Sequence, residues 1–125
     1  MIRVPFIVAR SMLALLPIAF AAAVSVSAAE LSFDLKVARG RVADNMRLIR
    51  VKQGDVVKLR WTSDQPLVVH LHGYDIEKRI APGGVTEMTF NAYATGRFAV
   101  HVHTQGAGGH AHEEAPLVNV EVYPR

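Results

Sequence analysis

Histidine is the residue type in this sequence that most directly points to chemistry, because all six histidines fall between positions 70 and 112. They form three His-x-His pairs, which are His70 and His72, His101 and His103, and His110 and His112. Exposed histidines also occupy polar strand faces without binding anything, but this density favours a ligand set. Imidazole is a common ligand of copper and zinc. The sequence therefore predicts a metal site built from these side chains.

The first two pairs lie in runs typical of β-strands, at 67–72 and 97–103. Side chains alternate between the faces of a strand, so both members of a pair point the same way, with Cα atoms roughly 6.5 to 7 Å apart. The opposite face of each run is apolar, with Leu67, Val69 and Leu71 in the first and Phe98, Val100 and Val102 in the second. We therefore expect a core on one side of these strands and imidazoles on the other.

Five further runs are typical of strands, at 31–37, 46–51, 56–62, 85–90 and 117–123. Glycine and proline turn signals recur about every ten residues between them, and the segment 76–81 is interpreted as a crossover. No stretch after residue 29 is typical of a helix. The pattern predicts one all-β domain over 30–125, an antiparallel β-sandwich, with Trp61 and Met88 in its core.

Residues 1–29 resemble a secretory signal peptide. The segment has Arg3 and Arg10 and no acid, then an apolar run over 12–24 and small residues over 25–29. The run is shorter than the roughly 20 residues of a spanning helix, although a retained anchor is the alternative. Cleavage after Ala29 would leave a periplasmic or secreted domain with 12 Lys and Arg against 11 Asp and Glu, since the leader holds two of the chain's 14 basic residues. Such a balance, with no interleaved aromatics, does not indicate nucleic-acid binding.

The chain has no cysteine. Disulfides, iron–sulfur clusters, cysteine nucleophiles and cysteine-containing copper sites are therefore excluded within a single chain. A hydrophobic core alone must hold the domain together, which is feasible at this size.

Several segments together resemble the cupredoxin-like superfamily. They are Val51–Ser63, a proline followed by the first histidine strand, Ala81–Phe90 and Ala94–His101, and His70-Leu-His-Gly73 is similar to motifs in multicopper oxidases. The resemblance implies a Greek-key sandwich with a metal site at one end. It also implies that His70 or His72 is one ligand and that His101 or His103 is another.

The sequence departs from the blue-copper pattern, because the segment after His103 offers His110 and His112 but no cysteine or methionine. Blue-copper electron transfer is therefore excluded. A histidine site suits Cu(II), and also Zn(II) or Ni(II), with water or a carboxylate of Asp75, Glu113 or Glu114 completing it. For Asp75 the turn-cap role is favoured over that of an acceptor orienting an imidazole.

The resulting hypothesis is an exported cupredoxin-like protein that holds or delivers copper without redox turnover of its own, and a non-enzymatic role is favoured over an enzymatic one. One alternative is a copper- or zinc-dependent oxidoreductase or hydrolase. A complete trinuclear cluster would need four His-x-His pairs, and only three occur. Another alternative is a metal-free interaction module of a periplasmic or membrane assembly. Any protein partner and the oligomeric state stay open.

Overall fold

The computed structural model describes residues 2–3, 5, 14, 16–23, 28–103 and 115–125. Eight strands and one short 3-10 helix form within these ranges. Their bounds are β1 (Glu30–Val37), η1 (Asp44–Met46), β2 (Leu48–Lys52), β3 (Val56–Ser63), β4 (Leu67–Leu71), β5 (Ile76–Ile80), β6 (Thr86–Asn91), β7 (Gly96–His103) and β8 (Val118–Tyr123).

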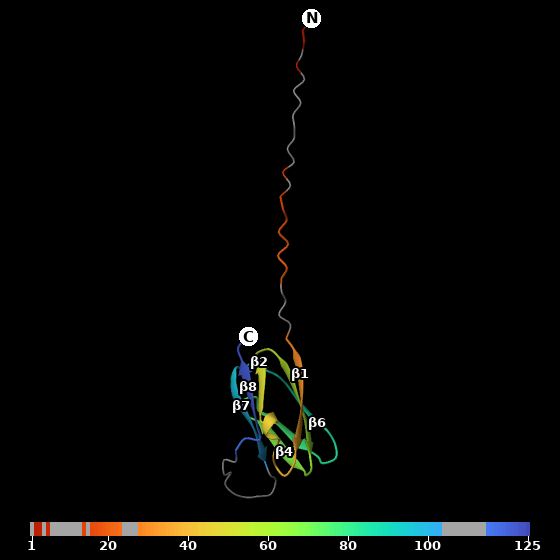
Figure 1. The fold of residues 1–125 in the computed structure, drawn as a ribbon, viewed down its shortest axis with the longest axis vertical. Coiled ribbons are helices and arrows are strands. Elements are labelled where there is room, and N and C mark those ends of the chain that lie inside the picture. Colours follow the sequence, from red (N-terminus) through yellow and green to blue (C-terminus); the bar gives the residue numbers. More distant parts are fainter. Residues whose placement is uncertain (1, 4, 6–13, 15, 24–27, 104–114) are drawn as a thin grey trace.

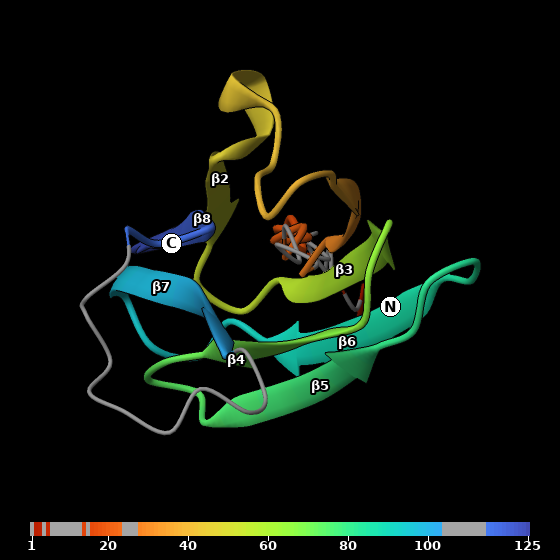
Figure 2. The same cartoon turned by 90° about the horizontal axis from the view of Figure 1, so that it is seen from below.

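The strands form two sheets that pack as a sandwich, which confirms the predicted fold class (Figure 1). One sheet has the order β1-β3-β6 and the other β2-β8-β7-β4-β5. Figure 2 shows the second sheet curving from β2 through β8 and β7 to β4 and β5 around one side of β3. Two neighbouring pairs, β1 with β3 and β2 with β8, are parallel, so the sheets are mixed and not purely antiparallel. β2 lies between β1 and β3 in sequence but belongs to the other sheet, where it brings the chain back to the end of the sandwich at which β1 began. β3 therefore starts at that same end and runs parallel to β1.

The segment expected to be a crossover is in fact the edge strand β5, which forms a hairpin with β4. Leu71 lies opposite Ile76, and Leu67 lies opposite Ile80. Three charged residues separate the two isoleucines, so the segment lacks the apolar alternation by which a strand is recognised.

Apolar side chains that alternate along the strands fill the space between the sheets. Trp61 and Met88, both predicted as core residues, are fully buried. They come from the three-stranded sheet, and the facing side chains include Val69, Leu71 and Val100 of the five-stranded sheet. Removal of this apolar surface from water is the main term that stabilises a domain without disulfides.

The buried carboxylate of Asp55 joins the two ends of the domain. It accepts hydrogen bonds from the backbone N–H of Lys52 at 2.9 Å and of Ala29 at 3.2 Å, and it forms an ion pair with Arg125. These contacts, above all the one from Lys52, lower the pKa of Asp55. The carbonyl of Ala29 also accepts a hydrogen bond from Val56 N–H at 2.9 Å, so Ala29 is tied to the fold one residue before β1 begins.

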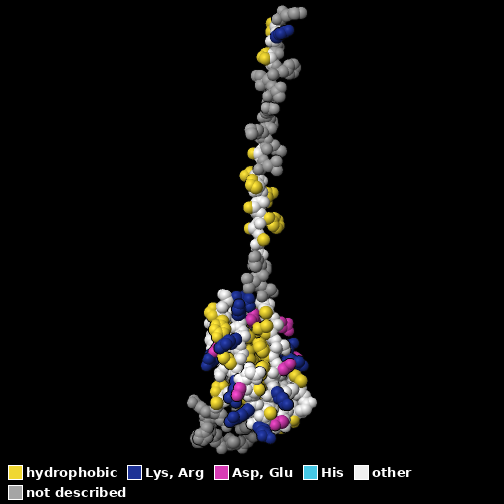
Figure 3. All heavy atoms as spheres, in the orientation of Figure 1, with side chains coloured by type: hydrophobic (Ala, Val, Ile, Leu, Met, Phe, Trp, Pro, Cys, Tyr) yellow, Lys and Arg dark blue, Asp and Glu magenta, His cyan; other side chains and the backbone are white. Residues whose placement is uncertain are grey.

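The described residues before position 24 extend away from the sandwich (Figures 1 and 3). Leu16, Ile18 and Phe20 are exposed there. Within the described ranges the structure contains no helix with the length and apolar character needed to cross a membrane. On the visible face of the sandwich, acidic and basic side chains are interspersed, as a domain of nearly balanced charge should have them. The assignment of residues 1–29 as a signal peptide stays a prediction.

Glu121 on β8 links three strands of the five-stranded sheet. Its Oε1 accepts from Nε of Arg97 on β7 at 3.0 Å, and its Oε2 accepts from Nε of Arg50 on β2 at 3.3 Å and from the hydroxyl of Tyr123 at 2.6 Å. The hydrogen bond from Tyr123, followed by those from Arg97, lowers the pKa of Glu121 from 4.5 to about 2.

This lowered pKa predicts a specific acid sensitivity. The contribution of Glu121 to stability is complete above the unfolded-state pKa of 4.5 and is lost as the pH falls toward about 2. Thermal unfolding measured between pH 6 and 2 should therefore show a shallower loss of Tm for Glu121→Gln than for the wild type over that window. Parallel Tm curves for the two proteins would contradict the prediction.

Candidate metal site

The pairing of β4 with β7 sets the positions of the first four histidines. These strands are antiparallel neighbours, with His70 opposite His101 and Val68 opposite His103. The pairing continues beyond β4, where His72 N–H donates to the carbonyl of Ala99 at 2.9 Å. Because side chains alternate, these four imidazoles share the face opposite Val69, Leu71 and Val100, which are fully buried. The predicted division of each run into a core face and a histidine face is confirmed.

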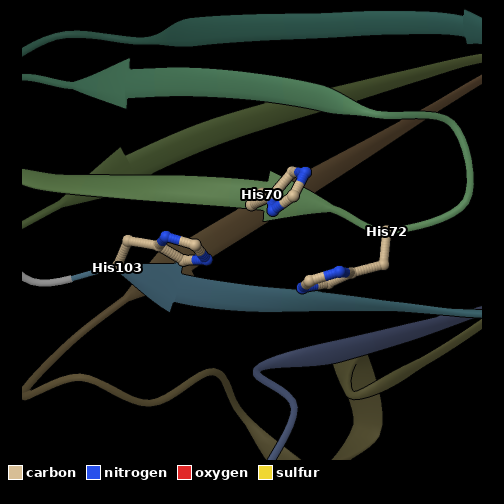
Figure 4. Close-up of side chains that lie close together, drawn as sticks. All are labelled: His70, His72 and His103. Atoms are coloured by element: carbon tan, nitrogen blue, oxygen red, sulfur yellow. The ribbon is translucent and has the colours of Figure 1, made fainter. Parts of the chain in front are cut away.

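Three of the imidazoles converge. One ring nitrogen from each of His70, His72 and His103 lies within 4.8 Å of the other two. Figure 4 shows His70 on β4, His72 just after it and His103 at the end of β7, with their rings gathered between the two strands. The centroid distances are 4.3 Å for His70 to His72, 5.3 Å for His70 to His103 and 6.4 Å for His72 to His103.

The remaining predicted ligands divide into two groups. His101 packs edge-on against His72, with centroids 4.9 Å apart, but it does not belong to the group of three. His110, His112, Glu113 and Glu114 lie outside the described residues. The site that the described residues form is on the open face of a sheet, whereas the family resemblance implied one end of the sandwich.

The group of three has the donor set of a metal site and needs a small closure to become one. Two imidazole nitrogens bound to one ion at about 2.0 to 2.1 Å can be no more than about 4.2 Å apart. That limit applies to donors on opposite sides of the ion, and nitrogens of a tetrahedral site are about 3.4 Å apart. The observed upper separation of 4.8 Å therefore requires the rings to approach by about 0.6 to 1.4 Å, which side-chain rotation can supply. Three neutral nitrogen donors suit Cu(II) and Zn(II) better than Cu(I), which prefers sulfur.

His70 is oriented by Asp75, whose carboxylate Oδ1 lies 3.3 Å from His70 Nε2. The other ring nitrogen, Nδ1, is buried and has no hydrogen-bond partner in the part of the chain that the structure describes. If Nε2 donates its proton to Asp75, Nδ1 carries the free lone pair that a metal requires. The contact is that of the alternative role predicted for Asp75, an acceptor that orients an imidazole.

His72 has an electronic environment suited to a ligand. Its ring lies against the rings of His70 and His101, although the residue as a whole is exposed. Loss of solvation, followed by the positive charges that His70, His101 and His103 acquire when protonated, lowers the pKa of His72. The neutral, metal-binding form of His72 is therefore favoured at neutral pH.

The turn after β4 holds both His72 and Asp75 in position. Gly73 and Asp75 have positive φ angles of 86° and 54°, which a tight β4–β5 turn demands and which glycine and aspartate tolerate best. Between them, the hydroxyl of Tyr74 donates to the carbonyl of Ala94 and accepts from its N–H. The Tyr74 ring also packs against Phe98 on β7, with centroids 4.8 Å apart. The turn is thus fixed to the strand that supplies His103.

Sequence reasoning missed one residue on this face. Glu77 on β5 lies directly opposite His70, so the two side chains share the outer face of the sheet. The sequence did contain a weak indication of this strand, because the apolar residues Ile76 and Ile80 stand at its two ends, on either side of Glu77.

Comparison with known proteins places the fold. No protein-family model and no curated protein matches the chain. A multi-copper oxidase from Pseudomonas thermotolerans matches with a TM-score of 0.59 and 21% identity over 79% of this chain and 31% of its own. The periplasmic domain of subunit II of cytochrome oxidase (CoxB) of Bradyrhizobium japonicum matches with a TM-score of 0.58 and 17% identity, over 75% of this chain and 84% of its own.

A copper binding protein solved in the apo form is also similar, with a TM-score of 0.57 and 10% identity over 74% of this chain and 87% of its own. The chain spans about a third of the length of the oxidase but most of the two smaller proteins. At these identities the likeness establishes the arrangement of strands, and the site must be argued from this chain's own residues.

The close approach of Gly73 to Phe98 predicts a large effect of a single methyl group. A Cβ at Gly73 would lie 2.4 Å from Cδ1 of Phe98, whereas a Cβ at Gly83 meets nothing within 4 Å. Both glycines have a φ near +85°, so alanine costs about 1 to 2 kcal/mol of backbone strain at either position. Overpacking adds about 1 to 3 kcal/mol for Gly73→Ala alone. Urea unfolding should therefore rank Gly73→Ala well below Gly83→Ala in stability, and equal losses would contradict the packing argument.

Proposed function

We propose that this chain, which has the cupredoxin-like fold and so belongs by structure to the cupredoxin-like superfamily, binds Cu(II) through His70, His72 and His103. The protein holds or delivers the ion and carries out no blue-copper electron transfer, because it has no cysteine to supply the thiolate. Residues 1–29 export it to the periplasm or beyond the cell. His101 completes the imidazole cluster, and His110 and His112 are further candidate ligands from outside the described residues.

The observation that carries the proposal is the buried Nδ1 of His70. A buried polar atom without a hydrogen bond is costly, and such atoms are rare in folded proteins. This atom belongs to a ring whose other nitrogen faces a carboxylate, and it is next to two more imidazoles. A bound cation would accept the lone pair of Nδ1, which otherwise has no partner among the described residues.

Copper is favoured over zinc by the affinity order of divalent ions for nitrogen donors. Three of the similar structures are named as a multi-copper oxidase, a copper binding protein and a copper nitrite reductase from Nitrosomonas europaea, which supports the same choice. Zinc remains the second ion to test, because a site of three imidazoles with an open position also suits it.

The proposal predicts that Cu(II) affinity depends on the group of three. In calorimetric titration of the exported domain, changing both His72 and His103 to alanine should lower the affinity by at least about 100-fold, since two of three donors are lost. His101→Ala, which leaves the three converging nitrogens in place, should lower it far less. Nitrogen hyperfine lines in the electron paramagnetic resonance spectrum should count about three imidazoles in the wild type. Unchanged affinity in the double variant would overturn the site.

The contact between Asp75 and His70 predicts a smaller, positional effect. Asp75→Asn keeps the shape of the turn residue but no longer fixes the proton of His70 on Nε2, so Cu(II) affinity should fall by about 10- to 100-fold. Asp34→Asn, at an exposed carboxylate of the other sheet, serves as the control and should bind as the wild type does. An Asp75→Asn protein with wild-type affinity would show that the carboxylate does not orient the ligand.

A further inference from the structure

A carboxylate next to the imidazole cluster has no role in the site as described so far. Glu77 on β5 pairs directly with His70 on β4, which in turn pairs with His101 on β7. Directly opposite residues in antiparallel strands have Cβ atoms roughly 4.5 to 5.5 Å apart on one face of the sheet. Glu77 is therefore a first neighbour of His70 on the face where the ligands converge.

Glu77 is exposed, and within the described residues it forms no hydrogen bond or ion pair. Among the described residues, the other carboxylates on this face already have partners. Asp75 contacts Nε2 of His70, and Glu121 is held by Arg97, Arg50 and Tyr123. The nearest cation on the same face of β5 is Arg79, which lies opposite Val68. Glu77 thus combines proximity to the site with a carboxylate that no other described residue binds.

The charge of a bound divalent ion gives the unpaired Glu77 carboxylate a function. Three neutral imidazoles leave the full double charge of a divalent ion uncompensated, and they leave at least one coordination position open. A carboxylate oxygen is a hard, anionic donor that prefers Cu(II) or Zn(II) to Cu(I). Glu77 has no partner among the described residues and lies directly opposite His70, so it is the candidate for that position.

We propose that Glu77 is the fourth protein ligand of the site, which would then bind a divalent ion through three imidazole nitrogens and one carboxylate oxygen. This inference rests on the proposed function and specifies it further. The Glu77 ligand makes the site selective for the oxidised ion, so that it binds Cu(II) more tightly than Cu(I).

The test compares Glu77→Gln, Glu77→Asp and Glu87→Gln in the exported domain. Glu87 is an exposed glutamate on β6 in the other sheet, so its variant controls for the loss of one surface charge. Glu77→Gln should lower Cu(II) affinity about tenfold or more, measured by competition with a chelator, and should leave Cu(I) affinity nearly unchanged. It should also shift the copper hyperfine splitting in the electron paramagnetic resonance spectrum, while the nitrogen lines stay. Glu77→Asp should recover part of the affinity, and Glu87→Gln should match the wild type.

The outcomes separate this inference from the function on which it rests. If the wild type binds Cu(II) through imidazoles and Glu77→Gln has the same affinity and spectrum, Glu77 is not a ligand and the three-histidine site stands. An equal loss of Cu(II) affinity in Glu77→Gln and Glu87→Gln would also overturn the inference, because the loss would then follow from the change in net charge and not from a missing ligand. If the wild type shows no imidazole-bound Cu(II), both proposals fail. Circular dichroism of each variant establishes that the fold is intact.

Discussion

The register between β4 and β7 is the constraint on which the rest of this structure depends. Val69, Leu71 and Val100 are fully buried and face the core. The four histidines of these two strands therefore lie on the opposite face of the sheet. Because side chains alternate with a period of two, a slip of one residue would bury imidazoles and expose valines. Burial of the apolar face thus determines where the imidazoles lie, although the imidazoles are not part of the core.

The same strands carry a second layer of support for the site. The turn between β4 and β5 is anchored to β7 through Tyr74 and Phe98, and the contact of Gly73 with the Phe98 ring leaves no room for a side chain. His72 and Asp75 lie on either side of this anchor. Their distances from His70 are therefore determined by aromatic packing, which gives a flexible-looking turn the rigidity that a ligand set needs.

Local patterns in the sequence were enough to predict the sandwich, its core residues and the face on which the first histidines lie, because alternation is a property of single strands. Long-range pairing was not accessible in the same way. The parallel pairs β1–β3 and β2–β8 depend on which sheet β2 joins, and no residue pattern within a strand states that. The strand β5 escaped notice because charged residues separate its two isoleucines. Glu77, the neighbour of His70 on β5, was therefore missed, whereas Asp75 in the turn had been considered as an acceptor for an imidazole but ranked below a turn cap.

The hydrogen bond from Ala29 N–H to Asp55 bears on where a leader could be removed. Removal of a leader after Ala29 would delete the N–H that Asp55 binds and the carbonyl that Val56 N–H binds. Removal one residue earlier would instead create a free α-amino group at Ala29, whose positive charge would sit 3.2 Å from a buried carboxylate. The new ammonium group of Ala29 would then join the start of the first strand to Arg125, because both would contact the carboxylate of Asp55.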